Sequence, residues 1–121
     1  MAHVLVFTEF SQGQLKKSAL ELLSAARKSG LKIQAVALGS GAKNLVDVLG
    51  KEGVDDAILG DDAAFDQYNP ELFTEVVSNI LNDKKPTVVL ASSSTLGRDL
   101  FPRVAARLNT GVVSDCTELE I

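Results

Sequence analysis

The chain has 121 residues, 45% of them hydrophobic and 23% charged, which corresponds to one domain large enough to bury its own core. Its net charge is −4, and its lysines and arginines are scattered instead of forming a basic stripe that could neutralise phosphates. With no tryptophan and one tyrosine, it also has little capacity to stack on bases. We therefore expect no nucleic-acid partner and no contact with an anionic membrane surface.

The sequence offers no targeting segment and no residues for catalysis. Its first apolar run, residues 4–7, is too short for a signal peptide, and no run approaches the roughly 20 residues of a membrane span. Cys116 is the only cysteine, so no intrachain disulfide can form, which fits a reducing compartment such as the cytoplasm. Because His3 is the only histidine and no nucleophile elbow occurs, we predict neither catalytic residues nor a metal site.

Short apolar runs alternate with helical stripes along the chain. Strands are predicted at residues 4–7, 32–38, 57–59 and 87–91. An amphipathic helix ending at Gly30 follows the first strand, and its apolar face consists of Leu15, Ala19, Leu22, Leu23 and Ala26. A short helix with Leu45, Val46, Val48 and Leu49 follows the second strand.

The third helix begins at Asn69-Pro70, with asparagine as N-cap and proline at the first helical position. Its expected apolar face consists of Leu72, Val76, Val77 and Ile80. Strands separated by helices at this spacing are typical of repeated βαβ units. The predicted fold class is α/β, a three-layer sandwich with a mainly parallel sheet of about five strands and a nucleotide-binding-like (Rossmann-like) topology.

The helix after the fourth strand contains a proline, Pro102, within an apolar stripe. Proline removes a backbone donor and clashes with the carbonyl four residues earlier, so the segment is either one bent helix or two helices. We favour one bent helix, because the stripe Leu96, Leu100, Phe101, Val104, Ala105 and Leu108 keeps its phase across the proline. Arg98, Asp99, Arg103 and Arg107 lie on or beside its polar side, as a solvated face or as a partner surface.

Ligands of parallel sheets bind beyond the carboxyl ends of the strands, which directs attention to the loops there. Ser92, Ser93, Ser94 and Thr95 precede a helix, where an anion could bind with help from Arg98, although a capped turn explains the same residues. In Gly39-Ser40-Gly41 we expect a turn with Ser40 as N-cap, because the dinucleotide fingerprint is incomplete. The acidic pairs Asp55/Asp56 and Asp61/Asp62 are interpreted as solvated loops, since a third metal ligand is missing.

The segments VLVFTE, LKKSALELLSAARKSG, LKIQAVALGSG, VDDAILGDDAAF and TLGRDLFPRVAARL occur in this order along the chain. Together they resemble the N-terminal part of the alpha subunits of electron-transfer flavoproteins. In the last segment Gly97, Arg98, Asp99, Pro102 and Arg103 match the family helix, and we interpret them as structural or subunit-contacting. The closing SDCTELEI reads as a strand, and another strand start is expected at Gly111.

The resemblance implies a heterodimer with a beta subunit that carries electrons from flavoprotein dehydrogenases, typically acyl-CoA dehydrogenases, to a quinone oxidoreductase or other acceptor. FAD is implied for the complete alpha/beta complex and not for residues 1–121, because its C-terminal binding domain is expected to be absent from this chain. The expected role is thus a scaffold and subunit-interface domain of an electron carrier, not an enzyme. The alternative is a free-standing adenine-nucleotide-binding module of the universal-stress-protein type, although its glycine-rich ATP pattern does not occur here.

Overall fold

The central sheet has five strands in the order β5-β4-β1-β6-β7 in the computed structural model, which describes residues 3–11, 13–92, 94–108 and 118–120. Their bounds are His3–Phe7 (β1), Lys32–Leu38 (β4), Asp56–Gly60 (β5), Val88–Leu90 (β6) and Glu118–Glu120 (β7). β1, β4, β5 and β6 pair in parallel, and β7 pairs antiparallel with β6. The mainly parallel sheet predicted from the sequence is confirmed.

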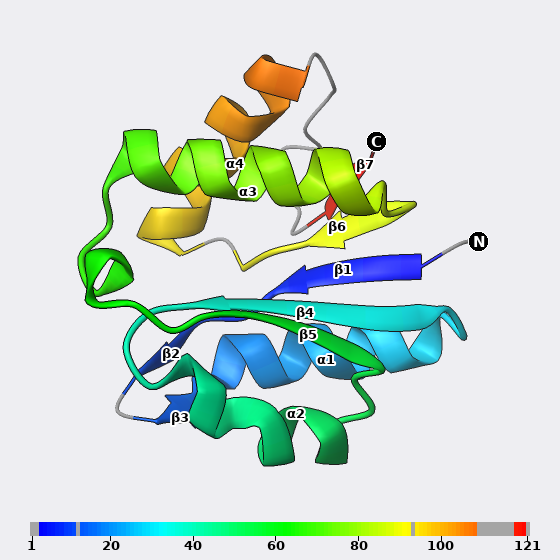
Figure 1. Ribbon diagram of the computed structural model, residues 1–121. Coiled ribbons are helices and arrows are strands. Elements are labelled where there is room, and N and C mark those ends of the chain that lie inside the picture. Colours follow the sequence, from blue (N-terminus) through cyan, green and yellow to red (C-terminus); the bar gives the residue numbers. More distant parts are fainter. Residues whose placement is uncertain (1–2, 12, 93, 109–117, 121) are drawn as a thin grey trace.

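Helices cover both faces of this sheet (Figure 1). α3 (Pro70–Lys84) and α4 (Thr95–Leu108) lie on one face, and α1 (Lys17–Lys28) and α2 (Val46–Lys51) lie on the other. Successive side chains of β1 point to opposite faces, so Leu5 and Phe7 enter the core under α3 and α4, while Val4 and Val6 enter the core under α1. The chain therefore forms the expected three-layer sandwich.

Local sequence signals located several helix ends correctly. The Oδ1 of Asn69 accepts a hydrogen bond from the backbone N–H of Leu72 at 3.1 Å, which makes it the N-cap of α3. Gly30 follows α1 with a φ of 75°, as expected of a residue that ends a helix in the left-handed region. α4 runs through Pro102 without interruption, and the proline ring is exposed, so the prediction of a single helix is confirmed.

Two predicted helix faces were wrong in detail. Leu15 does not belong to α1 but to β3 (Gln14–Leu15), which forms a small antiparallel hairpin with β2 (Phe10–Ser11). On α3 the buried stripe is shifted by one residue, because the helix is rotated so that Phe73, Val77, Ser78 and Leu81 face the sheet. Leu72, Val76 and Ile80 are half-buried at the edge of that contact.

The segment before α2 also differs from expectation. A 3₁₀ turn, η1 (Ala42–Leu45), comes first, and its N-cap is Gly41 at a φ of 85°, not Ser40. Val46, expected on the apolar face, is 53% exposed, since the change from η1 to α2 turns it outward. A second 3₁₀ turn, η2 (Ala63–Phe65), follows β5. The strand start expected at residue 111 lies outside the described residues.

Candidate functional site

The loops after β1 and β6 meet at the carboxyl edge of the sheet, where the chain changes direction across β1. β4 and β5 lie on one side of β1 and β6 on the other, so the strand order reverses between β1 and β6, the place where open α/β sheets commonly bind ligands. Between these two loops the Oε2 of Glu9 accepts hydrogen bonds from the hydroxyls of Ser92 at 2.5 Å and of Ser94 at 2.7 Å. The Nζ of Lys16 lies 3.9 Å from the other carboxylate oxygen. A carboxylate of the chain itself therefore joins the two loops.

Ser94 also begins α4. Its Oγ accepts a hydrogen bond from the backbone N–H of Gly97 at 3.1 Å, and its carbonyl accepts one from the N–H of Arg98 at 2.9 Å. The Ser94 hydroxyl thus caps the helix and donates to Glu9 at the same time. The other residues of the anion site considered above do not join this cluster: the Thr95 and Arg98 side chains are exposed, and Ser93 lies outside the described residues.

Gly97 is required by the close approach of α4 to the loop before it. A Cβ at this position would lie 2.1 Å from the backbone oxygen of Ser92, a distance that no side chain can adopt without moving the backbone. The glycine therefore lets the first turn of α4 pack against the Ser92 carbonyl. Sequence reasoning noted Gly97 only as part of a motif, and it did not single out Glu9, although a carboxylate directly after the first strand was the available signal.

Carboxylates also occupy the adjacent edge loop. The two carboxylate oxygens of Asp66 accept from the backbone N–H of Ser40 at 2.7 Å and from its hydroxyl at 2.8 Å. Those of Asp61 accept from the N–H groups of Gly41 at 3.0 Å and Lys43 at 3.2 Å, and these two amides hold the pKa of Asp61 below its usual value. The exposed Asp61 thus ties two loops together, which corrects its interpretation as a merely solvated residue.

The other acidic residues are also held by specific hydrogen bonds. The Oδ2 of Asp55 accepts from the N–H of Ile33 at 2.8 Å, and that of Asp56 accepts from the side chain of Gln34 at 3.2 Å. Asp62 accepts from the N–H of Ala64 at 2.9 Å and caps η2. Among the described parts of the chain, no three histidine, cysteine or acidic side chains gather as a metal site would require.

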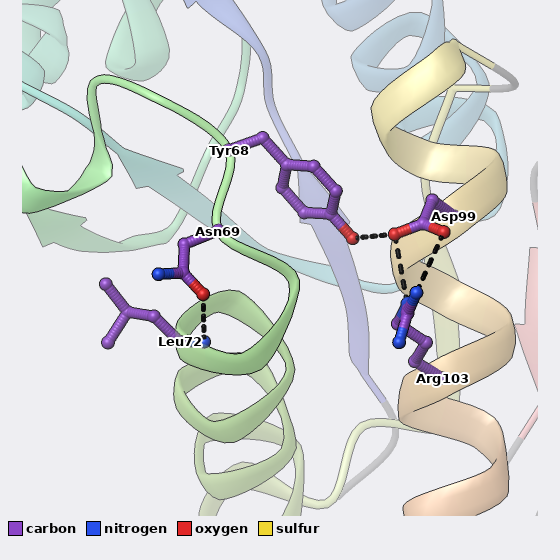
Figure 2. Close-up of polar contacts among 5 residues, drawn as sticks. All are labelled: Tyr68, Asn69, Leu72, Asp99 and Arg103. Carbon is purple, nitrogen blue, oxygen red and sulfur yellow. Dashed lines mark hydrogen bonds and ion pairs between the residues drawn. The ribbon is translucent and has the colours of Figure 1, made fainter.

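A second polar cluster joins α4 to the segment before α3 (Figure 2). The Tyr68 hydroxyl donates to Oδ2 of Asp99 at 2.5 Å, and the Nε of Arg103 donates to the same oxygen at 3.0 Å. Asp99 and Arg103 form the intrahelical pair expected from their spacing of four. Next to this cluster, residues 63–64 and 67–71 together with Arg103 line an open groove of about 720 Å³.

The cluster shifts the ionisation of its members in opposite directions. Burial, and then the hydrogen bond to the Asp99 carboxylate, raise the pKa of Tyr68 to about 12. The hydrogen bonds from Tyr68 and Arg103 hold the pKa of Asp99 below its usual value, and Asp99 in turn raises the pKa of Arg103. At neutral pH the tyrosine is neutral and the ion pair is charged, so the cluster fastens α4 to the segment before α3.

The fold and its edge loops define a Rossmann-like α/β domain, and comparison with known proteins shows which family it represents. The family model described as "Electron transfer flavoprotein domain" matches residues 4–121. The chain is 38% identical over 122 residues to Protein FixB of Clostridium saccharobutylicum, covering 98% of this chain and 36% of the relative. It is 35% identical over 122 residues to the electron transfer flavoprotein subunit alpha of Clostridium acetobutylicum, with the same coverage.

A third relative is named as a part of an enzyme complex. It is the acryloyl-CoA reductase electron transfer subunit beta of Anaerotignum propionicum, 36% identical over 120 residues, covering 96% of this chain and 33% of the relative. The chain therefore belongs to the electron transfer flavoprotein family, and it spans about a third of the length of the curated relatives it matches.

The flavin of this family finds no suitable donors at the described carboxyl edge of the sheet. The hydroxyls of Ser92 and Ser94 already donate to Glu9, and the amides after β4 donate to Asp61 and Asp66. A pyrophosphate placed there would meet carboxylates instead of free donors. The edge loops therefore do not fit FAD.

No described helix is long and apolar enough to span a membrane.

Gly97→Ala tests the close packing at the start of α4. Because the added methyl group collides with the Ser92 carbonyl, we expect a loss of about 2–4 kcal/mol in the free energy of unfolding, measured by urea denaturation. Gly50→Ala is the matched control: this glycine lies in α2 with open space around its Cα, so alanine should stabilise by about 0.5–1 kcal/mol. Equal effects of the two changes would contradict the packing argument.

Tyr68 can be titrated directly, because it is the only tyrosine in a chain without tryptophan. Tyrosinate absorbance against pH should give a pKa near 12, and Asp99→Asn should lower it towards the usual value of about 10. Because the folded pKa lies above the unfolded one, this group's contribution to stability is complete below about pH 10 and is lost as the pH rises from there through 12. An unchanged pKa in Asp99→Asn would show that the carboxylate has no part in the shift.

Proposed function

We propose that the chain is the N-terminal α/β domain of an electron transfer flavoprotein alpha subunit and acts as its scaffold and subunit-interface domain. The observation that carries this proposal is the family match over residues 4–121, joined to relatives named as alpha subunits and FixB. The polar groups of the carboxyl edge supply a further argument, because they are used in contacts within the domain. Such a domain positions a partner instead of holding a ligand.

In the proposed complex, FAD is held outside this domain, by further residues of the alpha subunit against the beta subunit. Electrons would come from flavoprotein dehydrogenases, such as acyl-CoA dehydrogenases, and pass to a quinone oxidoreductase or other acceptor. The relative named as an electron transfer subunit of acryloyl-CoA reductase supports a donor or acceptor of the acyl-CoA class. The chain would then be an electron-carrier subunit without catalytic residues of its own, working in the cytoplasm.

The outer face of α4 is the surface we propose for contact with the beta subunit. Its exposed residues include Arg98, Pro102, Arg103, Ala106 and Arg107, and the three arginines carry three positive charges on a chain of net charge −4. Arginine is favoured in interfaces because its guanidinium group can bind carboxylates in a bidentate manner. In the described part of the chain Arg103 pairs with Asp99, whereas Arg98 and Arg107 form no ion pair. Gly97 and Pro102 would act structurally beside them.

Charge reversal on α4 tests this interface. We expect Arg98→Glu with Arg107→Glu to weaken binding to the beta subunit encoded in the same genome by at least about tenfold at low ionic strength, because complementary charges steer and stabilise such contacts. Binding of this chain to the beta subunit can be measured by calorimetry or by co-purification of the two proteins. Lys17→Glu with Lys51→Glu is the matched control, since it changes the net charge equally on α1 and α2, the opposite layer. Equal losses in the two double variants would argue against α4 as the interface.

A nucleotide titration separates this proposal from the stress-protein alternative. A nucleotide-binding module would be stabilised by about 2.7 kcal/mol at a hundredfold excess of ligand over Kd. We expect no concentration-dependent rise in the melting temperature with ATP, ADP or AMP, because Glu9 holds the hydroxyls that phosphates would need. A clear rise that Arg98→Ala abolishes would favour the alternative class.

A further inference from the structure

β5 is an edge strand whose outer side faces solvent. It stands first in the strand order of the sheet, and among the described strands it pairs with β4 alone (Figure 1). Residues 57–60 are half-buried, whereas residues 4–7 of β1 and 35–37 of β4 are fully buried. The difference arises because β5 lacks a neighbour on its outer side.

The outward-facing backbone groups of β5 belong to Ala57 and Leu59. The carbonyl of Gly60 accepts a hydrogen bond from the N–H of Gly39, directly after β4, at 2.9 Å, so Gly60 is turned towards β4. In a parallel ladder every second residue of a strand bonds to the same neighbour, which turns Ile58 towards β4 as well. Ala57 and Leu59 therefore direct their N–H and C=O groups away from the sheet. Such an edge is a template for pairing with another extended chain.

β5 does not carry the features that commonly protect an edge strand from pairing. Lysine, proline or a bulge in the strand prevents the approach of a second chain. The five residues of β5, DAILG, include neither lysine nor proline, and their register with β4 is continuous. The centre of the strand is apolar, so its outer edge is open to an apolar extended segment.

Carboxylates flank this edge at both ends. Asp55 and Asp56 precede the apolar centre and Asp61 and Asp62 follow it, and all four residues are exposed. None of them forms an ion pair with a residue of the described ranges. Antiparallel pairing of two copies of β5 about Ile58 would place Asp55 of one copy opposite Asp61 of the other, and like charges in this position destabilise a sheet. The charge pattern therefore disfavours a second copy and favours a strand with basic ends.

We propose that the outer edge of β5 is a docking site for an extended segment of a partner protein, with an apolar centre and basic residues at both ends. The main-chain groups of Ala57 and Leu59 pair with the backbone of the segment, and the flanking carboxylates select its basic ends. The edge of β5 is a different surface from the outer face of α4. The inference therefore does not depend on the proposed contact with the beta subunit.

The experiment uses a synthetic peptide in which valine and threonine alternate over the length of β5, with two lysines added at each end. It is titrated into the isotope-labelled 121-residue chain at low ionic strength and followed by NMR. The amide signals of Ala57 and Leu59 should shift most and their hydrogen exchange should slow, because these N–H groups gain acceptors. The same peptide with glutamates in place of the lysines should bind at least about tenfold more weakly.

Matched variants separate backbone pairing from charge attraction. A peptide with every valine and threonine N-methylated keeps its side chains and charges but loses its backbone donors, so it should not bind. Ala57→Pro replaces an outward N–H and should abolish binding without removing a bond to β4. Asp56→Lys should weaken binding roughly threefold or more. Glu75→Lys makes an equal change of charge on the exposed side of α3 and should leave binding nearly unchanged.

Failure of the lysine peptide to bind, or equal binding of the lysine and glutamate peptides, would overturn the proposal. Binding of the N-methylated peptide would overturn it as well, since that peptide cannot pair through its backbone. A dimer of the chain formed through the amides of Ala57 and Leu59, detected by analytical ultracentrifugation, would assign the edge to a second copy instead. If Ala57→Pro does not fold, the N-methylated peptide tests the pairing on the wild-type chain.

Discussion

The position of β1 in the middle of the sheet is the constraint on which the rest of the domain depends. β4 and β6 both pair with β1 in parallel, so its side chains enter the cores on both faces. Thr8, which follows directly, is 1% exposed and satisfies its hydroxyl by donating to the carbonyl of Val36 at 2.9 Å. The next residue is Glu9, and the same buried strand that organises the sheet therefore also determines where this carboxylate lies.

Acidic side chains at the carboxyl edge of the sheet accept hydrogen bonds from the loops that face them. Glu9 accepts from the serines before α4, and Asp66 and Asp61 accept from the amides after β4. Each of these contacts joins two loops that are far apart in the sequence. The donors named here are therefore satisfied within the domain.

Much of the fold could be predicted because its signals are local. The runs at residues 4–7 and 32–38 are strands since most of their residues are apolar, and Asn69-Pro70 begins a helix through its own cap. The sequence did not predict how α3 is rotated about its own axis, and therefore which of its residues are buried. Phe73 and Leu81 face the sheet instead of Leu72 and Ile80, because the side chains of α4 and the sheet determine which part of a broad apolar face is buried.

In the candidate site, too, the sequence determined the local features and the tertiary structure determined the long-range contacts. The amino-acid sequence by itself determined the family motif of α4 and the Asp99–Arg103 pair, because these depend on neighbours within a few residues along one helix. Only the tertiary structure brought Glu9 to Ser92 and Ser94, 83 and 85 residues away, and Tyr68 to Asp99, 31 residues away. Contacts of that separation arise from the order of the strands and the packing of the layers, which no local spacing in the chain encodes.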